Sequence, residues 1–176
     1  MRNIIWFVAL FLLLLIQGGI LLPLHIAPVN LILIMVAMAV ILSDFNQGLA
    51  ITLIGGLLLD FVSGSPDGLV SISLLTVFLI MRVVMNEILS REPSYYILAA
   101  SVAVSTLVYF LAFLAVDRLF GIFSLTQKPE VGYILSVQLP LTIMWNLIFA
   151  YPIFLLYSFV QNLASKLPHG EESIQV

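Results

Sequence analysis

One stripe of residues in a predicted apolar helix combines small side chains with a carboxylate, and it is the clearest candidate for a functional site. Its residues recur at intervals of four and so share one face of a predicted helix: Gly48, Thr52, Gly56 and Asp60. Small residues at this spacing let another helix approach closely, and a carboxylate within a spanning segment is costly unless it is paired. We therefore expect one of two arrangements. Either the stripe packs within the bundle, with Asp60 in the headgroup region, or Asp60 anchors a partner or a buried polar network. In both arrangements Asp60 could cap N–H groups of the turn that follows.

The rest of the chain contains few residues that are suited to catalysis or metal binding. His25 and His169 are far apart and fall in predicted loops, so an intramembrane serine–histidine pair is not expected. An aspartyl protease needs two facing carboxylates, but Asp44 is predicted on the other side from Asp60, and Asp67 lies in a turn. Cysteine is absent, and no cluster of metal ligands is formed. We therefore expect no enzyme, no cofactor and no metal.

The elements that position these residues are membrane helices, as the composition indicates. Hydrophobic residues make up 62% of the 176 residues and charged residues only 9%, whereas about a quarter of a soluble domain is charged. A spanning helix needs about 20 apolar residues, so a chain of this length has room for about six spans and no separate soluble domain. No basic run is present, so nucleic acid is not an expected partner.

Turn residues divide the apolar sequence into segments of spanning length. We predict an all-α integral membrane protein, a compact bundle of about six transmembrane helices with short loops. The single transmembrane domain covers residues 1–162, and a polar C-terminal tail covers 163–176. The predicted spans are residues 4–22, 28–42, 45–62, 69–89, 95–116 and 134–160.

Several residues refine these boundaries. Pro28 suits the first turn of the second helix, and Asp44 with Gln47 has the spacing of a capping box at the start of the third. Arg82 lies inside an apolar run, and its side chain is expected to extend toward the nearer interface. Pro140 and Pro152 are expected to kink the last helix, and residues 119–125 are expected to lie in the membrane interface.

The orientation follows from the basic residues near the span ends. Six spans place both termini on one side, and this side carries more Lys and Arg than the other, which favours cytoplasmic termini. The side of the termini carries Arg2, Arg82, Arg91 and Lys166, and the opposite side carries Arg118 and Lys128. Arg118 is expected on the side of Asp60, so the two side chains could pair.

The segment Gly55 to Gly68, GGLLLDFVSGSPDG, and the apolar helix that follows it resemble the MreD family of rod shape-determining integral membrane proteins of bacteria. The family shows a glycine, an aspartate four residues later and a Ser–Gly–Ser-type turn with a further glycine. These features fall here on Gly56, Asp60, Ser63, Gly64, Ser65 and Gly68. Ala27–Leu31 is a weaker match to the family's second helix, and the acidic tip Ser65–Asp67 departs from the pattern.

The resemblance implies a non-enzymatic scaffold that determines cell shape within the cell-elongation complex for peptidoglycan synthesis, the elongasome. The protein would lie in the bacterial cytoplasmic (inner) membrane as a multi-pass protein. Its expected partner is MreC, a single-span protein with a coiled coil and an outer β domain. Further partners implied by the resemblance are the elongation glycosyltransferase, its penicillin-binding transpeptidase and the cytoplasmic actin-like filament.

Two hypotheses about binding follow. In the first, the stripe, with Ser101 and Ser105 of the fifth helix, forms a groove for the transmembrane helix of MreC. In the second, the protein is the substrate-binding component of a vitamin-type importer, which needs polar side chains near mid-membrane. The candidates for that role are Gln17, Gln138 and Asn146, with Trp145 and Tyr151 to stack on a ligand. Asn146 would otherwise form an interhelical hydrogen bond.

Overall fold

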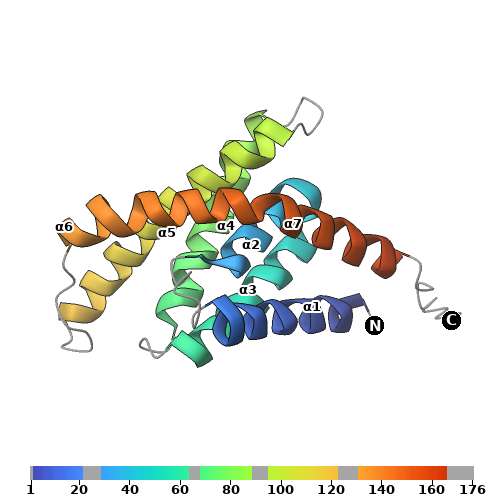
Figure 1. Cartoon of the computed structure of the whole chain (residues 1–176), viewed down its shortest axis with the longest axis horizontal. Helices are drawn as coiled ribbons and strands as arrows, with labels where there is room; N and C mark the ends of the chain where they lie inside the picture. Colours follow the sequence, from blue (N-terminus) through green and yellow to red (C-terminus); the bar gives the residue numbers. More distant parts are fainter. Residues whose placement is uncertain (1, 22–28, 64–67, 89–94, 123–130, 166–176) are drawn as a thin grey trace, which may run out of the picture.

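The computed structural model describes residues 2–21, 29–63, 68–88, 95–122 and 131–165, and this part of the chain is helical (Figure 1). Helix α1 (Arg2–Ile16) continues into the π-helical segment η1 (Gln17–Leu21). It is followed by α2 (Leu31–Leu42), α3 (Phe45–Ser63), α4 (Leu69–Ile88) and α5 (Tyr95–Ile122). The last rod runs without a break through α6 (Val131–Tyr133), the π-helical η2 (Ile134–Gln138) and α7 (Leu139–Ser165). The predicted all-α bundle is confirmed.

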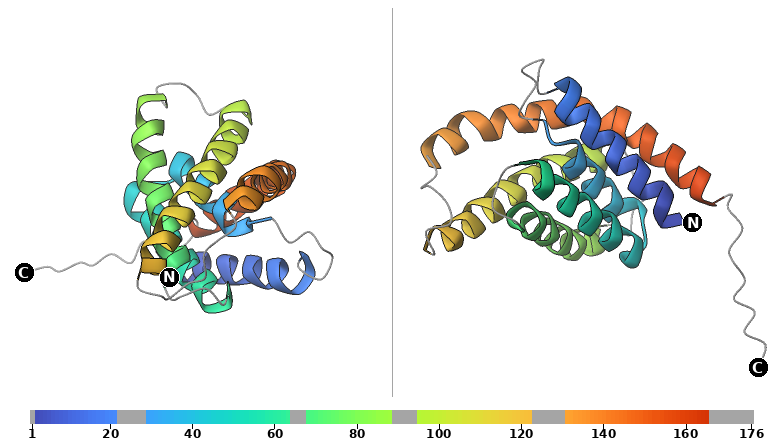
Figure 2. Two further views of the ribbon diagram at one scale, coloured as in Figure 1. Left: turned by 90° about the vertical axis from the view of Figure 1, so that its left-hand side faces the viewer. Right: turned by 90° about the horizontal axis from the view of Figure 1, so that it is seen from below.

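The helices pack as an irregular bundle in which consecutive rods run in alternating directions (Figures 1 and 2). Helix α3 packs against α4, α4 against α5, and α5 against α7. The start of α1 and the end of α7 lie at the same end of the molecule, and α1 runs beside the second half of α7 (Figure 2). This arrangement agrees with an even number of passes.

Helix α2 lies at the centre of the bundle and differs from a full span. It contains 12 residues, a rise of about 18 Å, whereas a bilayer core is about 30 Å thick. Every residue from Leu31 to Ile41 is buried, because α1, α3, α4, α5 and α7 surround the helix. A helix that is apolar all round belongs inside a protein. The predicted second span is therefore a short core helix.

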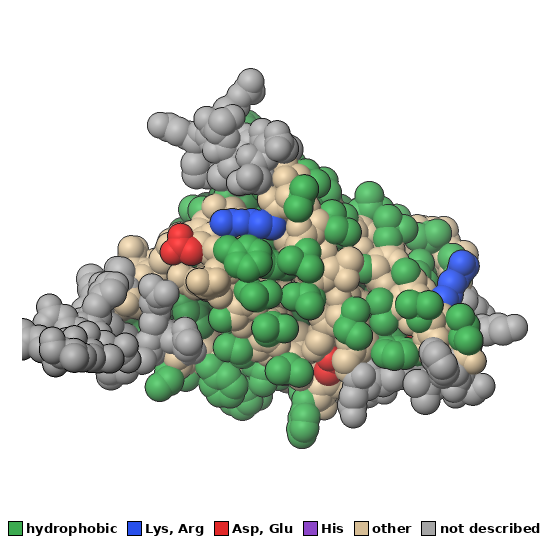
Figure 3. Space-filling model, turned by 180° about the vertical axis from the view of Figure 1, so that it is seen from behind, with side chains coloured by type: hydrophobic (Ala, Val, Ile, Leu, Met, Phe, Trp, Pro, Cys, Tyr) green, Lys and Arg blue, Asp and Glu red, His purple; other side chains and the backbone are tan. Residues whose placement is uncertain are grey.

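Within the described residues, four segments are long and apolar enough to cross a membrane by length and composition: Ile4–Leu21, Phe45–Ser63, Tyr96–Ile122 and Val131–Ala164. Helix α4 contributes a shorter apolar stretch, Leu69–Met85. Hydrophobic side chains are spread over the face shown in Figure 3, and few charged ones lie among them, while polar side chains such as Thr106, Thr142 and Asn146 are buried. An apolar exterior around polar interior groups is the arrangement that a bilayer requires.

Two boundaries differ from the prediction. Helix α5 continues to Ile122 because Asp117 and Arg118, which were expected to end it, are accommodated on different faces: Asp117 is buried and Arg118 is exposed. Residues 119–122 therefore form the last turn of α5, and residues 123–125 of the predicted interfacial stretch lie outside the described residues. In the last rod, the N–H of Leu139 donates to the carbonyl of Ile134, five residues earlier. This wide turn comes directly before Pro140, which has no N–H of its own to donate.

Candidate functional site

The predicted stripe lies at a close joint between α3 and α4. A Cβ atom added to Gly56 would lie 2.9 Å from the Cα of Ser71 and 3.0 Å from its Oγ, and a Cβ added to Gly48 would lie 2.7 Å from Cε2 of Phe78. Thr52 is 1% exposed, and its hydroxyl donates to the carbonyl of Gly48 at 2.8 Å. The small residues therefore bring the two helices of this chain together.

Asp60 ends the stripe and caps the beginning of α4. Its Oδ1 accepts a hydrogen bond from the N–H of Val70 at 2.8 Å, and its Oδ2 accepts from the N–H of Ser71 at 3.0 Å and from the Ser71 hydroxyl. Gly68, with φ of 91°, precedes α4 in the left-handed region that favours glycine. Because glycine has no side chain to cap a helix, the carboxylate of α3 takes that role, at the end where a helix favours negative charge.

The structure places most of the predicted motif residues in or beside this joint between α3 and α4. Gly48, Thr52, Gly56 and Asp60 are all buried inside the chain, so the stripe does not line an open groove in this structure. Ser63 is exposed at the end of α3, and its hydroxyl donates to the Asp60 carbonyl at 3.4 Å. The possible pairing of Asp60 with Arg118 is not formed between these two described residues: Arg118 is exposed, and Asp60 bonds to the start of α4. Gly64 and the tip Ser65–Asp67 lie outside the described residues.

The N-cap residue Asn30 and side chains from two other elements, η1 and α7, satisfy the amino end of α2. The amide oxygen of Asn30 accepts from the N–H of Leu33 at 2.9 Å, and that of Gln17 accepts from the N–H of Leu31 at 2.9 Å. Asn146 of α7 accepts from the N–H of Asn30 at 3.0 Å and donates to the Thr106 hydroxyl at 2.9 Å. The interhelical hydrogen bond predicted for Asn146 is thus confirmed.

The carboxyl end of α2 is satisfied in the same way. Arg82 of α4 donates from Nη1 to the carbonyls of Val40, at 2.6 Å, and Ser43, at 3.0 Å. Gln161 donates to the Leu42 carbonyl at 3.3 Å, and the hydroxyls of Ser43 and Tyr157 are hydrogen-bonded. The expected snorkelling of Arg82 is therefore replaced by a cap inside the bundle, where a cation meets the negative end of a helix.

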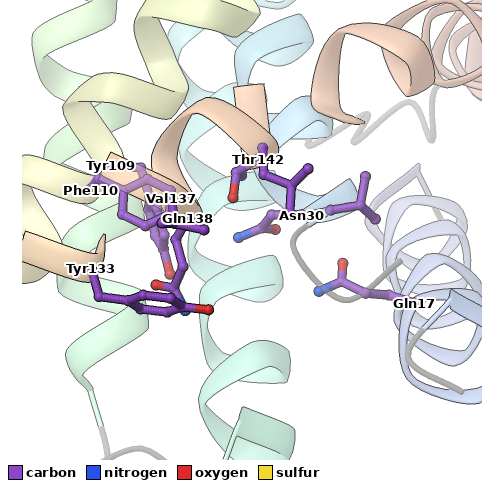
Figure 4. A pocket seen from close by; sticks show the side chains of 10 residues that line it. Gln17, Asn30, Tyr109, Phe110, Tyr133, Val137, Gln138 and Thr142 are labelled. Carbon is purple, nitrogen blue, oxygen red and sulfur yellow. The ribbon is translucent and has the colours of Figure 1, made fainter. Parts of the chain in front are cut away.

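A cavity of about 450 Å³ lies at the amino end of α2 (Figure 4). Its lining comes from η1, the two residues before α2, α5 and the rod formed by α6, η2 and α7. It comprises Gln17, Val29, Asn30, Tyr109, Phe110, Tyr133, Val137, Gln138, Leu141 and Thr142. Two of the three polar residues that the importer hypothesis singled out, Gln17 and Gln138, meet here, although they lie far apart in the sequence. Asn146 is not among the lining residues, but its side chain accepts a hydrogen bond from the N–H of Asn30.

Four residues of the cavity are not predicted from the sequence as members of a common site: Asn30, Tyr109, Tyr133 and Thr142. The available signal was the position of Asn30, a helix-capping residue type directly before an unbroken apolar run. The other three appear in sequence as ordinary polar or aromatic interruptions of apolar helices. Of the proposed stacking residues, Trp145 packs on Phe149 with ring centroids 6.3 Å apart, and Tyr151 is 54% exposed, so neither lines the cavity.

The remaining sequence candidates do not form a groove or a metal centre in the described part of the chain. Ser101 and Ser105 are buried, and Ser101 donates to the Leu98 carbonyl at 3.1 Å. Among the described residues, no group of three His, Cys, Asp or Glu side chains could hold a metal ion; His25 and His169 lie outside those residues. Comparisons of the chain with models of protein families, with curated proteins and with solved structures find no match.

Proposed function

We propose that this protein is a non-enzymatic scaffold of the bacterial cell-elongation machinery that binds the transmembrane helix of MreC, as the resemblance to the MreD family implies. The joint between α3 and α4 carries the proposal. Three of the residues that carry the resemblance act together in this joint. Gly56 permits the close approach of the helices, Asp60 caps α4, and Gly68 forms the turn before it. A motif of interdependent structural parts suits a rigid binding platform rather than a reaction centre.

We infer a different binding face for the partner helix from the one expected from the sequence. The stripe on α3 is covered by α4, so a helix from MreC would pack on an outward face of the bundle. A neighbouring face of α3 carries exposed apolar side chains at the same spacing, Leu53, Leu57 and Phe61. Through MreC, the protein would be linked to the elongation glycosyltransferase, the penicillin-binding transpeptidase and the actin-like filament.

Photocrosslinking in living cells tests this proposal. A photoreactive residue replaces, one at a time, the exposed Leu57 of α3, Leu107 of α5 and Leu155 of α7, and adducts are identified by mass spectrometry. We expect one of these faces to give a dominant adduct with MreC. Thr52, which is 1% exposed, is the matched control and should give no adduct with another protein.

Other adducts would redirect the proposal. A dominant adduct with a multi-span coupling subunit that carries ATPases would favour the importer hypothesis, which the meeting of Gln17 and Gln138 in one cavity supports. If none of the three positions captures MreC while the protein is present at its native level in the membrane, the result would count against the scaffold.

A further inference from the structure

The cavity at the amino end of α2 has the dimensions of a ligand site. Its volume of about 450 Å³ lies within the range of about 300–1,000 Å³ that is typical of small-molecule sites. Both π-helical segments reach it: η1 supplies Gln17, and η2 supplies Val137 and Gln138. Wide turns of this kind inside α-helices often occur at functional sites, and here two of them border the same space.

The lining is polar but uncharged. Six of the lining residues carry amide or hydroxyl groups, and none carries a charge: Gln17, Asn30, Tyr109, Tyr133, Gln138 and Thr142. Amides and hydroxyls both donate and accept hydrogen bonds. An ion would lose its hydration here without gaining an opposite charge, which is costly in an apolar surrounding. The lining therefore suits a neutral ligand that is rich in hydrogen-bonding groups.

Two hydroxyls in the cavity lack a partner within the described part of the chain. Thr142 is 4% exposed, yet its hydroxyl has no hydrogen bond there, whereas the hydroxyls of Thr52 and Thr106 each donate to the carbonyl four residues earlier. The Tyr109 hydroxyl is likewise without a bonded partner among those residues. Both side chains line the cavity, and neither hydroxyl is fully enclosed by the described residues, so each is open to a ligand that could bond it.

Aromatic rings form one side of the cavity. Figure 4 shows Tyr109, Phe110, Gln138 and Tyr133 together, with Asn30 and Thr142 across from them. The rings of Tyr109 and Phe110 meet edge to face, with centroids 6.0 Å apart. A pyranose ring has an apolar C–H face that packs on an aromatic ring and a periphery of hydroxyls that amides can bond.

The rim of the cavity is apolar and belongs to the outer surface. Val137 and Leu141 lie four residues apart on the last rod and are 45% and 39% exposed, while Tyr133, one turn earlier, is 53% exposed. We propose that this cavity binds a neutral sugar ring, borne by a lipid or free, with Gln138, Thr142 and Tyr109 bonding its hydroxyls. The proposal does not depend on the scaffold role.

Native mass spectrometry of the full chain tests the proposal. The protein is purified in a zwitterionic detergent, which contains no sugar, and is mixed with monoglucosyl diacylglycerol, plain diacylglycerol or phosphatidylglycerol. We expect the glucosyl lipid to be retained about tenfold more than either other lipid. Gln138→Leu and Thr142→Val should each reduce retention about fivefold, the effect of one lost hydrogen bond. The control Thr76→Val, outside the cavity lining, should leave retention unchanged.

Competition with methyl glucoside distinguishes the two sources of the sugar. Displacement of the glucosyl lipid would support binding of a free sugar, and resistance to displacement would support binding of a lipid-borne one. Equal retention of the glucosyl lipid and plain diacylglycerol, or preferential retention of phosphatidylglycerol, would overturn the proposal. Unchanged retention by Gln138→Leu would do the same, and because Gln138 is exposed this variant is expected to fold.

Discussion

The carboxylate of Asp60 on α3 accepts a hydrogen bond from the backbone N–H of Val70 on α4 at 2.8 Å. The cap of α4 is thus supplied by the preceding helix, ten residues earlier in the chain. This arrangement ties the start of α4 to the end of α3 at the point where Gly56 brings the two helices into contact. The joint therefore depends on the carboxylate of Asp60 and on the absence of a side chain at Gly56.

Replacement of Asp60 by alanine is expected to destabilise the bundle by about 1–3 kcal/mol, because it leaves buried N–H groups of α4 without acceptors. Asp60→Asn retains one acceptor oxygen and should cost less. The measurement is the unfolding midpoint of the purified protein during titration with a denaturing detergent. Ser71→Ala, which removes only the hydroxyl donor to Asp60, is the control and should have the smallest effect. Equal midpoints for Asp60→Ala and the parent would refute the cap.

Gly56→Ala is expected to cost about 1–3 kcal/mol, because the added methyl group would lie 2.9 Å from a backbone atom of Ser71, so the helices must move apart. Gly56→Leu should prevent correct packing altogether. Gly132→Ala is the matched control, since a Cβ there has nothing within 4 Å. Thermal aggregation of the three variants, followed by size-exclusion chromatography, provides the comparison. A Gly56→Ala protein as stable as the Gly132→Ala protein would contradict the close joint.

Arg82→Gln is expected to lower the free energy of unfolding by about 2 kcal/mol, since two carbonyls at the end of α2 lose a charged donor. Arg118→Gln removes the same charge from an exposed position and should be nearly neutral. The two variants have identical net charge, so the difference between their unfolding midpoints isolates the cap. If the two midpoints coincide, Arg82 does not stabilise α2.

Asn146 and Thr106 are expected to be energetically coupled. Asn146→Leu leaves the N–H of Asn30 without its acceptor, and Thr106→Val removes the hydroxyl that Asn146 donates to. A double-mutant cycle on unfolding free energies should give an interaction energy of about 0.5–3 kcal/mol. Strict additivity of the two substitutions would mean that the hydrogen bond between them contributes nothing to stability.

The boundaries of the helices were largely predictable from the sequence. The third and fourth helices, predicted over 45–62 and 69–89, are observed as Phe45–Ser63 and Leu69–Ile88, because Gly, Pro, Ser and Asp interrupt the apolar runs at those points. The central position of α2 was less accessible. A short apolar run of 12 residues fits both a strained span and a buried core helix, and only the surrounding helices decide between them.

The polar contacts were harder to predict than the helices. Asp60 was expected to cap N–H groups of the following turn or to meet Arg118, and spacing alone could not show that its partners are Val70 and Ser71 at the start of α4. The cavity depends on Gln17, Tyr109 and Gln138, which come from three rods. Their meeting is a property of tertiary packing that no local pattern in the sequence carries.

The caps of α2 have a consequence for how the protein is made. Helix α2 leaves the ribosome well before Arg82 and Asn146, which satisfy its two ends. At about 18 Å it does not span the hydrocarbon core, and free carbonyl and N–H groups at its ends are costly in lipid. The ends of α2 therefore remain without these partners until α4 and α7 have been made, so the fold around α2 is completed only when the last helix is in place.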